Sequence, residues 1–155
     1  METWILDGYD VPVYVVGPAD AKTTVVFIHD IFSIHEGRVK ALCDFLAELG
    51  YRVVFPDWHK GDSLDHAEDR ESRMLKFGAW ITAHPVDEVV RMFADTCNRV
   101  RGVGKKVAAI GFCWGTWVLY HAQKSGVAID GCVCMHPSIA LEDRLGGNHS
   151  DLLKA

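Results

Sequence analysis

The chain has 155 residues, of which 49% are hydrophobic and 24% charged, and its formal net charge is −5. This size and balance are typical of one globular domain, so we expect residues 1–155 to form a single domain. The negative charge and the lack of a basic stripe argue against a nucleic-acid or anionic-membrane partner. No apolar run reaches the roughly 18 residues that a membrane span needs.

The amino terminus and the cysteines bear on cellular location. Residues 1–4 lack the basic and apolar regions of a signal peptide, and five cysteines at irregular spacing predict no disulfide framework. We expect Cys132 and Cys134 to face opposite sides of a strand and to form neither a disulfide nor a metal pair. Because reduced thiols are typical of the cytosol, a cytoplasmic location is expected.

Strands and helices are predicted to alternate along the chain. Apolar, β-branched runs predict strands, and apolar residues at helical spacing predict helices. The predicted strands lie at residues 3–6, 11–16, 23–28, 51–55, 107–110 and 129–135. The predicted helices lie at residues 39–49, 71–82, 86–100 and 116–122. The run at 23–28 is rich in β-branched and apolar residues, and the runs at 51–55 and 129–135 are mostly apolar, which predicts strands buried on both faces.

This alternation predicts the α/β class, with a mostly parallel, doubly wound sheet and helices on both faces. The first two strands could instead form an antiparallel ribbon at the edge of the sheet. Ligands bind such sheets beyond the carboxyl ends of the strands. We therefore expect the loops at 29–34, 57–62, 112–115 and 136–139 to surround the site.

The most informative segment is Gly111-Phe112-Cys113-Trp114-Gly115, which lies between a predicted strand and a predicted helix. A nucleophile flanked by small residues two positions away on each side is the pattern of a nucleophile elbow. Such a turn holds its central residue in a strained conformation and exposes it beside the positive end of the following helix. That environment favours a thiolate and can hold an oxyanion. Cys113 is therefore the predicted nucleophile.

Together with two further segments, the elbow resembles the dienelactone hydrolase family, a branch of the α/β-hydrolase fold with a cysteine nucleophile. His29-Asp30-Ile31-Phe32-Ser33 is similar to the family's segment after the third strand. Phe55-Pro56-Asp57, followed by Lys60-Gly61-Asp62, is similar to the loop after its fourth strand. The resemblance extends from about residue 23 to residue 138.

The resemblance implies that Cys113 attacks the carbonyl of a small-molecule ester or lactone and forms a thioester acyl-enzyme, which water hydrolyses. It implies that the backbone N–H groups of Ile31 and Trp114 hold the oxyanion. Asp30 takes the position of an acidic residue that helps to form the thiolate. No cofactor is expected.

Other residues near the strand ends are weaker candidates. His136, His59 and Trp58 are expected to line the pocket. An acidic and histidine-rich loop could suggest a divalent metal site, but it lacks a recognised ligand spacing, so no metal is predicted. The residues of that loop are Asp57, His59, Asp62, Asp65, His66 and Asp69. Arg70 and Arg73 could meet a substrate carboxylate, although an exposed helix face is the simpler interpretation.

The resemblance also places the acid and the histidine of the triad beyond residue 155, on loops after the last two strands of the fold. We therefore expect an α/β-hydrolase fold without its last strands, with the strand at 129–135 on an open sheet edge. A protein partner or a second copy could cover that edge. Two alternatives remain open: a non-catalytic relative that serves as a structural or binding subunit, and redox sensing through Cys113.

Overall fold

The computed structural model describes residues 1–35, 37–64, 69–102 and 104–154, and their strands form one six-stranded sheet in the order β1-β2-β4-β3-β5-β6. The strands are β1 (Glu2–Leu6), β2 (Tyr9–Val16), β3 (Thr23–Ile28), β4 (Arg52–Pro56), β5 (Lys106–Phe112) and β6 (Gly131–Met135). Strands β4, β3, β5 and β6 pair in parallel, whereas β2 pairs antiparallel with both β1 and β4. The predicted α/β class and the antiparallel ribbon at the sheet edge are both confirmed.

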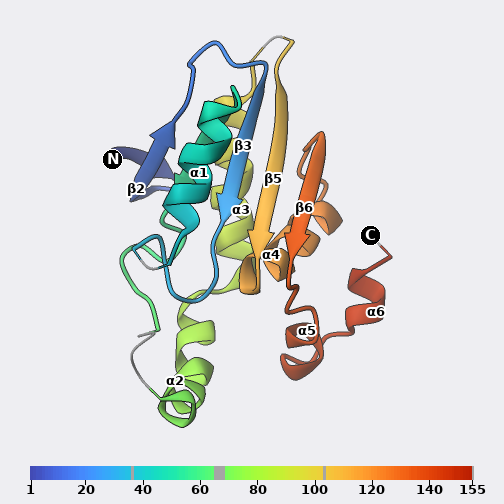
Figure 1. Ribbon diagram of the computed structural model, residues 1–155. Helices are drawn as coiled ribbons and strands as arrows, with labels where there is room; N and C mark the ends of the chain where they lie inside the picture. Colours follow the sequence, from blue (N-terminus) through green and yellow to red (C-terminus); the bar gives the residue numbers. More distant parts are fainter. Residues whose placement is uncertain (36, 65–68, 103, 155) are drawn as a thin grey trace.

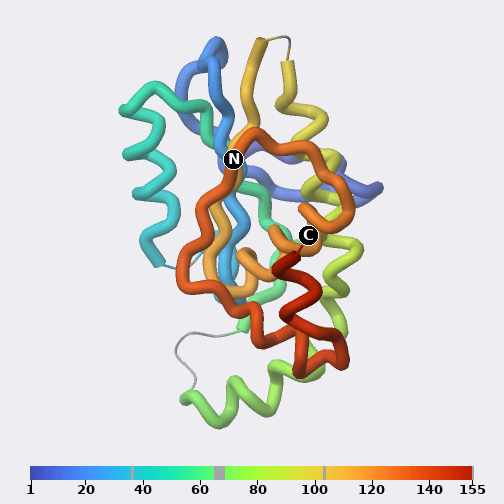
Figure 2. Tube along the Cα trace, turned by 90° about the vertical axis from the view of Figure 1, so that its right-hand side faces the viewer, coloured from blue at the N-terminus to red at the C-terminus, as the bar shows by residue number. Residues whose placement is uncertain are grey.

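Helices cover both faces of the sheet. They are α1 (Val39–Glu48), α2 (Arg70–Ala83), α3 (Val86–Val100), α4 (Trp114–Lys124), α5 (Leu141–Arg144) and α6 (His149–Leu152). Helix α1 lies on one face, and α3 and α4 lie on the other (Figures 1 and 2). Helix α2 lies beyond the carboxyl ends of the parallel strands (Figure 1). Within the described ranges, no helix combines the length and the apolar character that crossing a bilayer requires.

The two helical layers explain why β3 is apolar on both faces. Val25 and Phe27 pack into a cluster with residues of α1, whereas Val26 and Ile28 pack into the larger cluster with α3 and α4. Because side chains alternate across a strand, burial on both faces requires an unbroken apolar run. The predicted burial of this strand is confirmed.

Strand β6 differs from the prediction in its burial. It forms an edge of the sheet, and four of its five residues are exposed, including Val133 at 51% and Met135 at 43%. Helix α1 packs over β2 and β4, away from this strand. The apolar run therefore predicted the strand correctly. The predicted burial of that strand was wrong, because the sequence of one strand does not show whether other strands or helices cover it.

The expected orientation of Cys132 and Cys134 is also wrong. Residues two apart in a strand point to the same face, because successive side chains alternate. Burial and the neighbouring Cys132 thiol raise the pKa of Cys134. Burial, together with the Cys134 and Cys132 thiols, raises the pKa of Tyr120 on α4. All five cysteines are free.

Candidate active site

Cys113 occupies the turn between β5 and α4, with a φ of 52° and a ψ of −111°. A positive φ is costly for a residue with a Cβ, so the surrounding structure must hold it in place. One restraint is a hydrogen bond of 3.0 Å that the Cys113 N–H donates to the carbonyl of Met135 at the end of β6. The strained turn predicted for a nucleophile elbow is therefore present.

The two glycines of the elbow allow close packing of the backbone. A Cβ on Gly115 would lie 2.3 Å from the carbonyl oxygen of Ile28 and 2.6 Å from that of His29. A Cβ on Gly111 would lie 2.8 Å from the carbonyl oxygen of Gly115. No real side chain tolerates such distances, so glycine at these positions lets α4 begin directly against β3.

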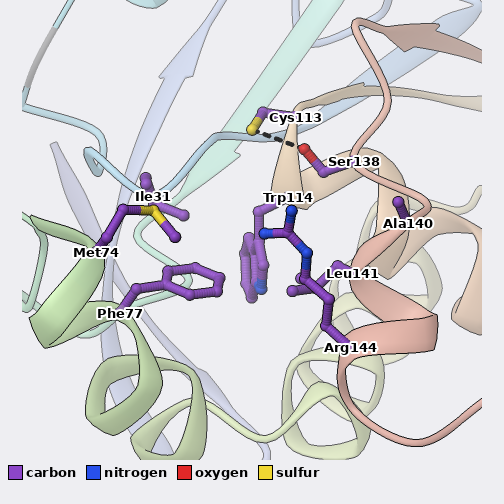
Figure 3. Close-up of a pocket in the computed structure, with 9 residues that line it drawn as sticks. All are labelled: Ile31, Met74, Phe77, Cys113, Trp114, Ser138, Ala140, Leu141 and Arg144. Carbon is purple, nitrogen blue, oxygen red and sulfur yellow. Dashed lines mark hydrogen bonds between the residues drawn. The ribbon is translucent and has the colours of Figure 1, made fainter. Parts of the chain in front are cut away.

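The Cys113 side chain is half-buried and faces a pocket of about 270 Å³ (Figure 3). The pocket is mostly apolar, and its lining includes one charged side chain, that of Arg144. The lining residues are Ile31, Met74, Phe77, Cys113, Trp114, Ser138, Ala140, Leu141 and Arg144. They come from the loop after β3, from α2, from the elbow, and from the segment that follows β6.

Five of these lining residues lie outside the loops that were expected to surround the site. Met74 and Phe77 lie three positions apart on α2, and this spacing on a predicted helix next to the strand ends could have indicated a shared face. Ala140, Leu141 and Arg144 lie in the tail, and no sequence pattern distinguishes them.

Ser138 has the closest polar contact with the predicted nucleophile. Its Oγ lies 3.0 Å from the Cys113 Sγ (Figure 3), and its N–H donates to the Cys113 carbonyl at 3.2 Å. The residue follows the strand next to β5, and the carboxyl ends of neighbouring parallel strands meet at one edge of the sheet. By that rule the loop at 136–139 was expected at the site, although the sequence did not distinguish Ser138 within it.

The two residues expected to hold the oxyanion both line this pocket. Trp114 is the first residue of α4, so its N–H has no acceptor within the helix and lies at the positive end of the helix dipole. Ile31 accepts a hydrogen bond of 3.0 Å through its carbonyl from the N–H of Leu64, which fixes the loop after β3. Two backbone segments suited to an oxyanion are thus close to one thiol.

Asp30 is not among the residues that line the pocket. Its carboxylate accepts a hydrogen bond of 2.9 Å from the N–H of Phe32, two residues further along the chain. A short acidic side chain forms such a local turn readily. The carboxylate therefore stabilises the loop that carries Ile31.

The three side chains expected to line the pocket lie elsewhere. Trp58 is buried and donates through its Nε1 to the Phe27 carbonyl at 2.7 Å. His59 is 1% exposed and packs edge-on against the rings of Trp80 and Trp114. Both rings are buried in the core, where they remove a large apolar area from water.

His136 also lies outside the described pocket lining. Its side chain is exposed, its φ is 39°, and its ring lies edge-on to that of Phe112. The turn at this residue redirects the chain after β6.

Two buried histidines lie next to one another behind the pocket wall. His29 donates through Nδ1 to the Asp30 carbonyl at 2.7 Å, and its Nε2 accepts from the N–H of Trp58 at 3.3 Å. Burial lowers the pKa of His29. Burial, reinforced by His29 and His84, also lowers the pKa of His59 well below its usual value, and no hydrogen-bond partner is recorded for either of its ring nitrogens among the described residues. In both cases the lowered pKa favours the neutral imidazole, and both rings are buried in the core.

Some of the residues weighed as metal ligands have other contacts in the part of the chain that the structure describes. Buried Asp57 accepts from the N–H of Gly61 at 2.9 Å, and Asp69 accepts two backbone hydrogen bonds at the start of α2. Asp65 and His66 lie outside the described residues. Within those residues, no group of three or more histidines, cysteines or carboxylates is arranged to hold a metal ion.

The two arginines considered for substrate binding lie on α2 rather than in the pocket lining. Arg70 is exposed, and the Arg73 guanidinium lies over the ring of Phe32, 5.7 Å from its centroid.

Comparison with known proteins places this geometry in a family. A maize (Zea mays) protein named endo-1,3;1,4-beta-D-glucanase is 28% identical over 130 residues, which cover 84% of this chain and 41% of that protein. A carboxymethylenebutenolidase homolog from Rattus norvegicus is 27% identical over 130 residues, which cover 75% of this chain and 49% of the rat protein. The chain thus spans about half the length of the curated relatives it matches.

A solved structure and a family model agree with these relatives. A Xanthomonas campestris protein, described as an α/β serine hydrolase without a lid, aligns with a TM-score of 0.61 at 19% identity. The alignment covers 88% of this chain and 61% of that protein, and it supports the α/β-hydrolase fold. The model of the dienelactone hydrolase family matches residues 11–151. This chain belongs to the dienelactone hydrolase family.

Proposed function

We propose that this site hydrolyses an ester or lactone, with Cys113 as the nucleophile. The observation that carries the proposal is the position of Cys113, which lies on a strained turn at the start of α4 and faces an apolar pocket. A sulfur at the positive end of a helix is well placed to react as a thiolate. The N–H groups of Trp114 and Ile31 are the donors that we assign to the oxyanion.

The proposed reaction has two steps. In the first, the Cys113 sulfur bonds to the carbonyl carbon, the carbon–oxygen bond of the ester breaks, and the proton that the thiol gives up goes to the leaving alkoxide, which becomes an alcohol. In the second, water attacks the thioester and the carbon–sulfur bond breaks, which releases a carboxylic acid, and a proton from the water returns to the sulfur to restore the thiol. A lactone follows the same steps, but its alcohol and acid remain on one molecule.

The two steps have different requirements. The second step needs a general base to activate water, and the lining of the described pocket includes no histidine and no carboxylate. Loss of one triad member typically costs on the order of 10⁴-fold in rate. We therefore expect this chain to form the acyl-enzyme much faster than it hydrolyses it.

The test is the release of p-nitrophenol from p-nitrophenyl acetate, followed from the first seconds after mixing. The expected result is a burst of about one equivalent of product per chain, then slow turnover. Cys113→Ala should abolish the burst. Cys132→Ala, which removes an exposed cysteine outside the pocket, is the matched control and should retain it. Equal product release by Cys113→Ala and the parent would rule out cysteine catalysis.

A second candidate function is that of a non-catalytic structural or binding subunit. The observation that favours it is the open edge of β6, where Val133 and Met135 expose apolar side chains. Strand edges of this kind pair readily with another chain. This candidate predicts no burst in the parent and a partner or second copy bound along β6.

A further inference from the structure

The contact between Ser138 and Cys113 carries an inference beyond the reaction itself. The two side chains lie 3.0 Å apart from Oγ to Sγ, and both line the same pocket (Figure 3). Among the described residues, the Cys113 sulfur is the one hydrogen-bond partner recorded for the Ser138 hydroxyl. The hydroxyl therefore serves the thiol rather than a structural network elsewhere.

The backbone fixes this contact from both sides. Ser138 donates its N–H to the Cys113 carbonyl, and Cys113 donates its N–H to the Met135 carbonyl. Three residues further on, the N–H of Leu141 donates to the Ser138 carbonyl at 3.0 Å. Ser138 is thus tied to the elbow on one side and to the start of α5 on the other.

The chemistry of the pair changes when the thiol loses its proton. In the neutral pair either the thiol or the hydroxyl can donate. In the thiolate the only hydrogen between the two atoms is that of the hydroxyl, so Ser138 becomes the donor. A hydrogen bond to a charged acceptor is stronger than one between neutral groups.

A neutral donor also differs from a carboxylate in its effect on a thiolate. A negative charge beside the sulfur disfavours a second negative charge, whereas a hydroxyl stabilises it without opposing it. The Asp30 carboxylate is bound to the N–H of Phe32. Of the two side chains, Ser138 is the one in contact with the sulfur.

We propose that Ser138 is a positioning residue that donates its hydroxyl hydrogen to the Cys113 thiolate and holds the sulfur toward the pocket. The proposal deepens the function proposed above and rests on Cys113 as its nucleophile. It concerns the thiolate alone, so it can be tested without any turnover of an ester.

The test measures alkylation of Cys113 by iodoacetamide as a function of pH, read at the Cys113 peptide by mass spectrometry. Because thiolates react and thiols do not, the midpoint of this profile is the pH at which half of the Cys113 side chains are thiolates. Ser138→Ala should move the midpoint upward by about 0.7 pH units and slow alkylation at neutral pH about fivefold, because the lost hydrogen bond stabilises the thiolate more than the neutral thiol.

Two further variants separate the hydroxyl from the shape of the side chain. Threonine and valine are nearly isosteric, so Ser138→Thr should keep the parent profile, and Ser138→Val should shift it as Ser138→Ala does. This pair keeps the test valid if the alanine variant fails to fold. Ser125→Ala, at the exposed far end of α4, is the control for loss of a serine hydroxyl.

Identical profiles for Ser138→Thr and Ser138→Val would overturn the proposal. So would a profile that shifts in Asp30→Asn and not in Ser138→Ala, because the carboxylate would then hold the sulfur. If the parent shows no burst with p-nitrophenyl acetate but the alkylation profile depends on the Ser138 hydroxyl, the proposed function fails while this assignment stands.

Discussion

Replacing Gly115 with alanine tests how the elbow is built. The new Cβ would lie 2.3 Å from the Ile28 carbonyl oxygen, whereas ordinary van der Waals contact begins at 3.4 Å. One atom of the clash is a backbone carbonyl oxygen and the other is a Cβ, so neither can move away by rotation of a side chain. The start of α4 must therefore move from β3 by about 1 Å.

That displacement sets the expected magnitudes. Overpacking of this kind costs typically about 1–3 kcal/mol, and the rigid backbone on both sides favours the upper end of that range. Movement of α4 also displaces Cys113 and the N–H of Trp114. A misplacement of about 1 Å can cost about 100-fold in rate, so the burst of p-nitrophenol should slow by that order.

The assay compares urea unfolding and burst kinetics of Gly115→Ala with those of Gly78→Ala. Nothing lies within 4 Å of a Cβ on Gly78, which is in the middle of α2. Alanine there should stabilise the protein by about 0.5–1 kcal/mol and leave the burst unchanged. A Gly115→Ala protein with the stability and burst rate of the parent would refute the close-packing argument.

Three further predictions concern pH and assembly. Burial lowers the pKa of His59, so below pH 6.5 the imidazole takes up a proton in the unfolded chain before it does so in the folded one, and the free energy of unfolding falls. His59→Leu should therefore flatten the decline of the urea midpoint between about pH 7.5 and about pH 5.5. An unchanged slope would contradict this. Partial burial of Glu142 opposes its ionisation, but hydrogen bonds from Trp117 and His121 lower its pKa, so its contribution is present above pH 4.5 and lost below it. Glu142→Gln should therefore cost about 1 kcal/mol at neutral pH in urea unfolding and little in acid, and equal losses at both would reject this account. The open edge of β6 predicts that the chain self-associates, as measured by light scattering, and that Val133→Lys reduces the association. A parent chain that stays monomeric at high concentration would argue against edge pairing.

The parts of the fold that were predictable rest on local patterns. The apolar run at β3 and the apolar stripe of α3 each indicate the type of one element and which of its residues are buried, and the structure contains both elements. The elbow was predictable because glycines at 111 and 115 are needed for a close approach that few other motifs require.

The parts that were not predictable depend on which neighbours a residue meets. Trp58 and His59 lie in a loop at the expected strand end, yet both rings are buried in the core behind the pocket. Met74 and Arg144 reach the pocket from segments far apart in the sequence, and single-sequence patterns do not report such contacts. Asp30 could have faced either the thiol or its own loop, and the local hydrogen bond to Phe32 prevailed.

Strand β6 pairs with β5 on one side and is open on the other, and the carbonyl of its last residue, Met135, accepts a hydrogen bond from the Cys113 N–H. Docking along the flank that displaces Met135 would therefore also displace the turn that holds the sulfur, and such a linkage would be reciprocal. Its signature would be an alkylation rate at Cys113 that changes over the same range of protein concentration as assembly. A rate independent of concentration throughout that range would show that the two are uncoupled.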